Sequence, residues 1–186
     1  MPADPRLVAL LAALDDARRA LADAVAAVPP ERRATPPAPG RWSVAEILEH
    51  CGRVEAGATR LIAGLVTAAP PRAPGDPGPD PDDPTAWSLP LAPFRDRSVR
   101  VAAPEFLHPT APPDAGAAWA RLEQARLALV ETVRAGDGRA LEAVSAPHPV
   151  FGPITAYQWI SAIAGHDVRH ALQVREAGEA LAAPVP

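Results

Sequence analysis

Apolar residues recur every three or four positions in four separate stretches of this chain. That spacing places them on one face of an α-helix, so each stretch predicts an amphipathic helix with one face turned toward a core. The first stretch follows Asp4-Pro5, a typical helix start, and is stopped by Pro29-Pro30. The second begins at the capping-box sequence Ser43-Val-Ala-Glu46 and is stopped by Pro70-Pro71.

The other two stretches lie in the C-terminal half of the chain. The third follows Asp114, a typical N-cap, and Arg126 is the polar exception on its apolar face. The fourth begins at a second capping box, Thr155-Ala-Tyr-Gln158, and we expect Gly178 to be its C-cap residue. The segment 148–153, which contains two prolines, is expected to be a rigid lead into this last helix.

Between the second and third helices the sequence carries a long proline-rich segment. Residues 69–113 contain 13 prolines and little periodicity, so no long helix can form there. Within it, residues 75–84 read as mobile, whereas five apolar residues are expected to lie against the protein, partly as a short extended stretch. These are Phe94, Val99, Val101, Phe106 and Leu107.

The pattern as a whole predicts an all-α protein. We expect a single domain over residues 1–186, built as a four-helix bundle with a long Pro-rich crossover at 69–113 and a C-terminal tail at 178–186. A chain of 186 residues that is 48% hydrophobic is long enough for one well-buried core.

Composition narrows the possible functions. A net charge of -4 provides no basic field for a nucleic-acid backbone, and no apolar run is long enough to span a membrane, so we expect neither partner. No basic segment followed by an apolar stretch opens the chain, which favours a cytoplasmic protein. One cysteine, Cys51, excludes an internal disulfide framework. All 18 basic residues are arginine, which excludes Schiff-base and P-loop chemistry because both need lysine.

Histidine spacing suggests a metal site. His166 and His170 are four residues apart on the fourth predicted helix, so both imidazoles can converge on one point, and His50 lies on the second helix. Three neutral nitrogen ligands with an open position are the set of a catalytic zinc site. Each histidine can instead be a core residue whose nitrogens are satisfied by hydrogen bonds.

Other side chains are candidates for roles around these histidines. Glu46 and Gln173 could orient a ligand from the second shell, as could Glu55, although Glu46 is also the capping-box partner. Cys51 points about 100° away from His50 on the same helix and reads as a core cysteine. Among the four tryptophans only Trp87, in the long loop, is a candidate for substrate contact, and the others are expected to be mostly core residues. Arg169 is expected to face solvent, with projection toward a ligand carboxylate as the alternative.

Two segments resemble the DinB-like superfamily: RWSVAEILEH at 41–50, and HPVFGPITAYQW at 148–159 followed by HDVRHALQ at 166–173. The resemblance runs from about Leu7 to Ala177. It implies a bundle with antiparallel first and second helices, a long crossover, and a divalent metal held by His50, His166 and His170. Members with known activity resemble metal-dependent thiol transferases, which join a small thiol to an electrophile or use it in isomerisation. Some similar proteins hydrolyse amides, and many have no assigned reaction.

The leading hypothesis is therefore a metal-dependent thiol S-transferase that acts on small electrophiles. It would use a divalent metal, zinc or nickel, together with a low-molecular-weight thiol, and by analogy it would form a homodimer. The alternatives are a non-catalytic metal-binding or stress-related bundle protein and a metal-dependent hydrolase. An open metal position with a pocket beside it would favour an enzyme, whereas a fourth protein ligand would favour a structural site.

Overall fold

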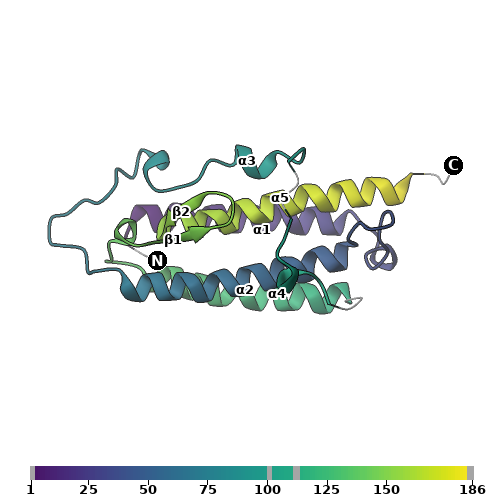
Figure 1. Ribbon diagram of the computed structural model, residues 1–186, viewed down its shortest axis with the longest axis horizontal. Helices are drawn as coiled ribbons and strands as arrows, with labels where there is room; N and C mark the ends of the chain where they lie inside the picture. Colours follow the sequence, from purple (N-terminus) through teal and green to yellow (C-terminus); the bar gives the residue numbers. More distant parts are fainter. Residues whose placement is uncertain (1–2, 100–101, 111–113, 184–186) are drawn as a thin grey trace.

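A computed structural model describes residues 3–99, 102–110 and 114–183 of the chain. These residues are mostly helical, with a small two-stranded sheet (Figure 1). The elements are α1 (Pro5–Ala26), α2 (Val44–Ala68), α3 (Ala92–Arg95), α4 (Ala115–Ala135), β1 (Ser145–His148), β2 (Gly152–Thr155) and α5 (Ala156–Ala182). No helix in the described ranges is both long enough and apolar enough to cross a membrane.

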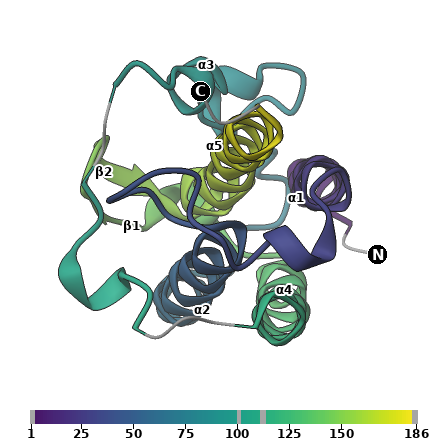
Figure 2. The same cartoon turned by 90° about the vertical axis from the view of Figure 1, so that its right-hand side faces the viewer.

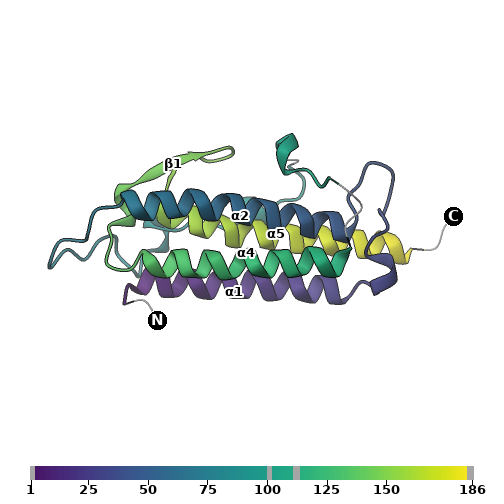
Figure 3. The same cartoon turned by 90° about the horizontal axis from the view of Figure 1, so that it is seen from below.

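The four long helices lie side by side, as the end-on view in Figure 2 shows. α1 packs along α5 and α2 packs along α4, while α2 also contacts α5. α1 and α5 run in one direction, and α2 and α4 run in the opposite one (Figure 3). Because α1 packs along α5, the first and last helices are neighbours. His50 of α2 can meet the histidines of α5 where α2 contacts α5.

The helix starts predicted from the sequence are confirmed. The Asp4 side chain accepts a hydrogen bond from the Arg6 amide at the start of α1, and Asp114 accepts one from Ala117 at the start of α4. Both predicted capping boxes form, at Ser43 with Glu46 and at Thr155 with Gln158. These caps satisfy backbone N–H groups that have no partner inside the helix.

The prediction that Gly178 ends the last helix is wrong, because α5 continues to Ala182. A Cβ atom at position 178 would lie only 2.9 Å from Cγ2 of Val28, just beyond the end of α1. The glycine therefore allows α5 to approach the chain that leaves α1, and it does not act as a helix stop.

The expected rigid lead at 148–153 is instead part of an antiparallel hairpin. Ser145 pairs with Thr155 and His148 pairs with Gly152, which has a positive φ of 70° in the turn. The prolines at 147 and 153 face each other across the ribbon. Proline cannot donate to a ladder, so its presence argues against a strand, but a two-stranded ribbon consists of edges, where proline is tolerated.

The long connection between α2 and α4 packs only in part as expected. Phe94 is buried in α3 against Gly165, but Val99 and Phe106 are 57% and 75% exposed, so the prediction for these two residues is wrong. Val101 lies outside the described residues. Trp87 is also not an exposed substrate contact: its side chain is buried, and Nε1 donates to the carbonyl oxygen of Asp80 at 3.1 Å.

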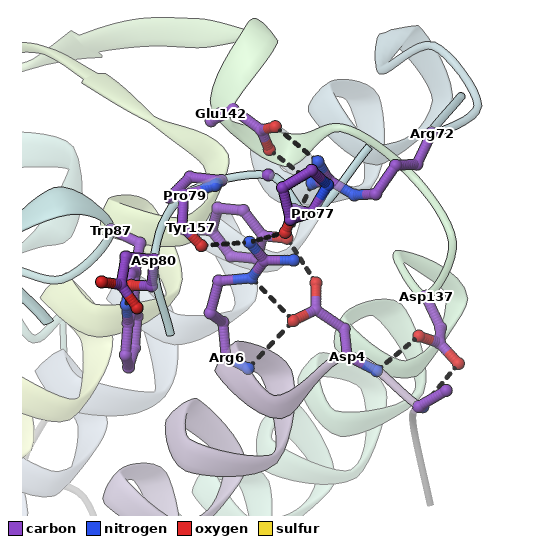
Figure 4. A network of polar contacts seen from close by, with 12 residues as sticks. Asp4, Arg6, Arg72, Pro77, Pro79, Asp80, Trp87, Asp137, Glu142 and Tyr157 are labelled. Atoms are coloured by element: carbon purple, nitrogen blue, oxygen red, sulfur yellow. Dashed lines mark hydrogen bonds and ion pairs between the residues drawn. The ribbon is translucent and has the colours of Figure 1, made fainter. Parts of the chain in front are cut away.

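A polar network joins residues 77–79 of this connection to the N-terminal ends of α1 and α5 (Figure 4). Arg6 Nη1 donates to the carbonyl oxygens of Pro77 and Pro79 at 2.9 and 2.6 Å. The Tyr157 hydroxyl donates to Asp4, which keeps the tyrosine protonated, since burial and this hydrogen bond both raise its pKa. The network holds part of the 75–84 segment that we expected to be mobile.

Each long helix contributes one charged side chain to a single buried group. We call this group the ion quartet: Arg18, Glu55, Arg126 and Asp167. Arg126 donates to Glu55 at 2.6 Å and to Asp167 at 2.9 Å, and Arg18 donates to the same two carboxylates at 2.5 and 3.0 Å. Each buried charge is thus paired, as burial requires.

Candidate metal centre

The structure brings His50, His166 and His170 together between α2 and α5. The ring centroids of His50 lie 5.2 Å from His166 and 4.9 Å from His170, and the His166 and His170 rings are 4.3 Å apart. α5 places its two histidines one turn apart on one face, and the capping box of α2 sets His50 one to two turns into that helix. The juxtaposition expected from the spacing is present.

Two hydrogen bonds fix which nitrogens face the centre. His50 Nδ1 lies 3.0 Å from the carbonyl oxygen of Leu107, and His170 Nδ1 lies 2.8 Å from Oε1 of Gln173. Both partners are acceptors, so each Nδ1 carries the proton and each Nε2 keeps its lone pair. Metal-binding histidines are oriented in this way by their second nitrogen.

The environment keeps these rings neutral. Burial lowers the pKa of His50, and the Leu107 hydrogen bond opposes this effect only in part. Burial lowers the pKa of His166 and of His170 well below 6.5, and the neighbouring imidazoles add to the shift. Neutral imidazole is the form that binds a metal.

The spacing of the nitrogens fits a divalent metal. Nε2 of His166 and Nε2 of His170 are 3.1 Å apart, and the ligand atoms of all three residues lie within 4.8 Å of one another. Zinc–nitrogen bonds of about 2.0–2.1 Å in a tetrahedral site require nitrogens roughly 3.3 Å apart. Small side-chain adjustments would therefore complete the set.

Among the described residues, no fourth side chain belongs to this histidine group. His50 and His170 are buried, and His166 is partly exposed. A second possible group combines His166 with Cys51 and Asp167. It is a poor metal site because Asp167 is paired with two arginines and burial raises the pKa of the Cys51 thiol well above its usual value.

Aromatic rings stand on both sides of the histidine group. On one side, Trp42 packs on His50 with ring centroids 4.9 Å apart, and His108 lies 5.7 Å from Trp42. On the other side, rings from α3, the hairpin and α5 form a continuous row, with centroids 4.9 to 5.3 Å apart in sequence Phe94, Phe151, His148 and Trp159. Phe94 also contacts Gly165, next to His166.

The other candidate residues have different surroundings. Gln173 contacts His170, whereas the Glu46 carboxylate accepts from Ser43 and lies in the capping box. Glu55 belongs to the ion quartet. Arg169 does not simply face solvent: its guanidinium donates to the carbonyl oxygens of Asp96 and Val99 at 2.7 and 2.5 Å.

Sequence reasoning missed two contacts of His50. The Leu107 carbonyl comes from the long connection, and no pattern in the sequence marks which of its backbone oxygens reaches α2. The sequence only weakly indicated the contact between Trp42 and His50: Trp42 directly precedes the Ser43 cap and so lies beside the first turns of α2.

The fold and the site together describe a small, mostly helical protein with a candidate metal centre. The chain belongs to the DinB superfamily, which it matches over residues 13–174. It is 28% identical over 144 residues to YuaE, an uncharacterized protein of Bacillus subtilis (strain 168), with 77% of this chain and 81% of that protein covered. No solved structure matches the chain.

Proposed function

We propose that the protein is a four-helix-bundle metalloprotein that transfers a small thiol to an electrophile. The observation that carries the proposal is the set of three neutral imidazoles, His50, His166 and His170, with Nε2 atoms facing one point and with exposure on one side. Zinc or nickel suits such a nitrogen set. A homodimer is part of the proposal by analogy alone.

A divalent metal held by three neutral ligands keeps its full charge and so lowers the pKa of a thiol or polarises a carbonyl. The chain's own residues would prepare the site for this chemistry. The Leu107 carbonyl and Gln173 hold two imidazoles in the tautomer with Nε2 free. The row of rings from Phe94 to Trp159 would exclude water and hold an apolar part of the electrophile.

The test is a conjugation assay on metal-reconstituted protein with a panel of cellular thiols and 1-chloro-2,4-dinitrobenzene as electrophile. We expect turnover with at least one thiol, loss of turnover on chelation, and recovery when metal is restored. His50→Ala is the negative control because it removes one metal ligand. Equal turnover by wild type and His50→Ala with every thiol would refute the proposal.

The second candidate is a non-catalytic metal protein, and a metal-dependent hydrolase is the third. A fourth protein ligand found by X-ray absorption spectroscopy of the metal-loaded protein would favour the non-catalytic candidate. Release of amine from small amide substrates, lost on chelation while thiol conjugation is absent, would favour the hydrolase.

A further inference from the structure

Three of the carboxylates near the histidine group on α2 and α5, those of Glu49, Glu55 and Asp167, are paired with arginines. Glu55 and Asp167 are paired with the two arginines of the ion quartet. Glu49 is paired with Arg53 at 2.9 Å. The Glu46 carboxylate accepts from the amide and hydroxyl of Ser43 and keeps its negative charge. A metal with three neutral ligands would therefore meet little negative charge from the chain, and its surroundings favour an anionic ligand.

Three arginines from different segments converge beside this group. Arg41 precedes α2, Arg97 follows α3, and Arg169 lies on α5. The carboxylate of Glu176 lies among them: Arg97 donates to both of its oxygens at 3.1 Å, and Arg41 Nη2 lies 3.7 Å from Oε2. The charges of all three arginines help to lower the pKa of Glu176, with the Arg97 hydrogen bond as the largest cause.

This arginine group adjoins the histidines on two sides. Arg169, Gln173 and Glu176 follow one another along a single face of α5, and Gln173 is the hydrogen-bond partner of His170. Arg41 directly precedes Trp42, whose ring packs on His50. The other acidic residue nearby, Asp96, directs its carboxylate to the amide and hydroxyl of Ser98.

An open cavity of about 610 Å³ lies beside Trp42 and Arg41. Its remaining wall is formed by Glu46 and by residues 36–40, three of which are prolines. Figure 1 shows that the loop that carries these residues, between α1 and α2, lies beside the C-terminal half of α5. A cavity of this size holds a small organic molecule.

We propose that this cavity and the arginines around Glu176 bind a small organic anion, with the carboxylate of the ligand at the arginines and its apolar part against Trp42. The arrangement already accommodates one carboxylate, that of Glu176, which is 40% exposed and can be displaced. Guanidinium groups match carboxylates through paired hydrogen bonds. As the substrate class of the metal centre this inference rests on the proposed function, but the anion site itself needs no metal.

The test is calorimetric titration of the full chain with benzoate in the presence of a chelator. Benzyl alcohol, an uncharged analogue of benzoate, is titrated in the same way. We expect saturable 1:1 binding of benzoate only, weakened by added salt. Arg41→Gln should weaken it about fivefold, the upper end for an exposed ion pair. Glu176→Gln should strengthen benzoate binding, because it removes the competing carboxylate.

Arg121→Gln, an exposed arginine on α4, is the matched control and should bind benzoate as the wild type does. Absent benzoate binding, equal binding of benzyl alcohol, or unchanged affinity in both Arg41→Gln and Glu176→Gln would overturn the inference. The opposite signs expected for the two variants exclude simple misfolding as the cause. Because metal is absent, failure of the thiol-transfer reaction leaves this result unaffected, and the reverse also holds.

Discussion

The five histidines of the chain have different surroundings, and these decide their chemistry. His50, His166 and His170 share one buried site. His108 instead donates Nε2–H to the carbonyl of Ala103, and His148 accepts at Nδ1 from the amides of Val150 and Phe151. Only the first three have nitrogens that converge on one point.

Replacing His170 with alanine should abolish stoichiometric metal uptake, because two imidazoles leave too few ligands for a tight site. Most helicity should remain, because α5 is capped and packed along its whole length. Elemental analysis of dialysed protein and circular dichroism are the measurements. His108→Ala serves as the control and should still take up one metal per chain. Uptake by His170→Ala would show that other residues bind the metal.

Stability of the metal-free protein should depend on pH. The folded pKa values of His166 and His170 are depressed by burial, so below about pH 6.5 the unfolded chain binds more protons than the folded one. The free energy of unfolding therefore falls as pH falls through this range. Urea unfolding between about pH 7 and 5 should show this slope, and the slope should be shallower in His170→Gln. Burial raises the pKa of Glu55, so this carboxyl makes the free energy of unfolding rise as pH falls through the lower range in which it titrates.

Some residues of the candidate site could be predicted from the sequence, and others could not. The i, i+4 spacing of His166 and His170 on an inward stripe was enough to place two imidazoles together. His50, on the second predicted helix, was the candidate third ligand, and the resemblance supported it. The Leu107 carbonyl could not be predicted, because backbone oxygens carry no residue signature and the connection follows no repeating pattern. The arginines around Glu176 come from three distant segments, so only the folded arrangement joins them.

At the level of elements, the ion quartet distinguishes the interior of this protein from a purely apolar one. Each member occupies an inward helical position between apolar residues: Arg18 lies between Leu14 and Leu21, and Arg126 lies between Leu122 and Leu129. A charged residue on an inward stripe was the available signal, and Arg126 showed it as the polar exception. The ion-pair partners in the quartet could not be deduced. Periodicity shows which face of a helix is buried, but not how the helix is shifted along its axis relative to its neighbours.

Arg126→Ala should destabilise the protein by about 3–5 kcal/mol, because it leaves the buried carboxylates of Glu55 and Asp167 with one arginine fewer. Arg121→Ala, on the exposed side of the same helix, should change stability by less than about 0.5 kcal/mol. Urea unfolding followed by circular dichroism measures both. Similar midpoints for the two variants would mean that the quartet contributes little to stability.

The caps and proline stops predicted the long helices to within a few residues, because these signals act locally. The hairpin was missed because Pro147, Pro149 and Pro153 argue against strands, and its pairing depends on a turn at Gly152 that the sequence does not distinguish from a loop.

At the scale of the whole molecule, the candidate metal centre joins α2, α5 and the connection that contributes Leu107. A ligand that binds only the folded state stabilises the entire fold by mass action. Zinc at a hundredfold excess over its dissociation constant should therefore raise the melting temperature by about 5 to 11 °C.

Differential scanning calorimetry with and without zinc measures this shift. His50→Ala should show little or no increase, although its helices and quartet are intact. An equal increase in both proteins would indicate that zinc binds elsewhere.

The adjacency of α1 and α5 also constrains how the chain can be made. α1 leaves the ribosome before α2 and α4, and α5, which covers its apolar face, follows them. At about 5–20 residues per second, its apolar face waits on the order of ten seconds for its partner. During that interval the nascent chain exposes Leu7, Leu14 and Leu21, which are fully buried in the finished fold. His50 is synthesised well before α5, so the three histidines can come together only after synthesis has passed His170.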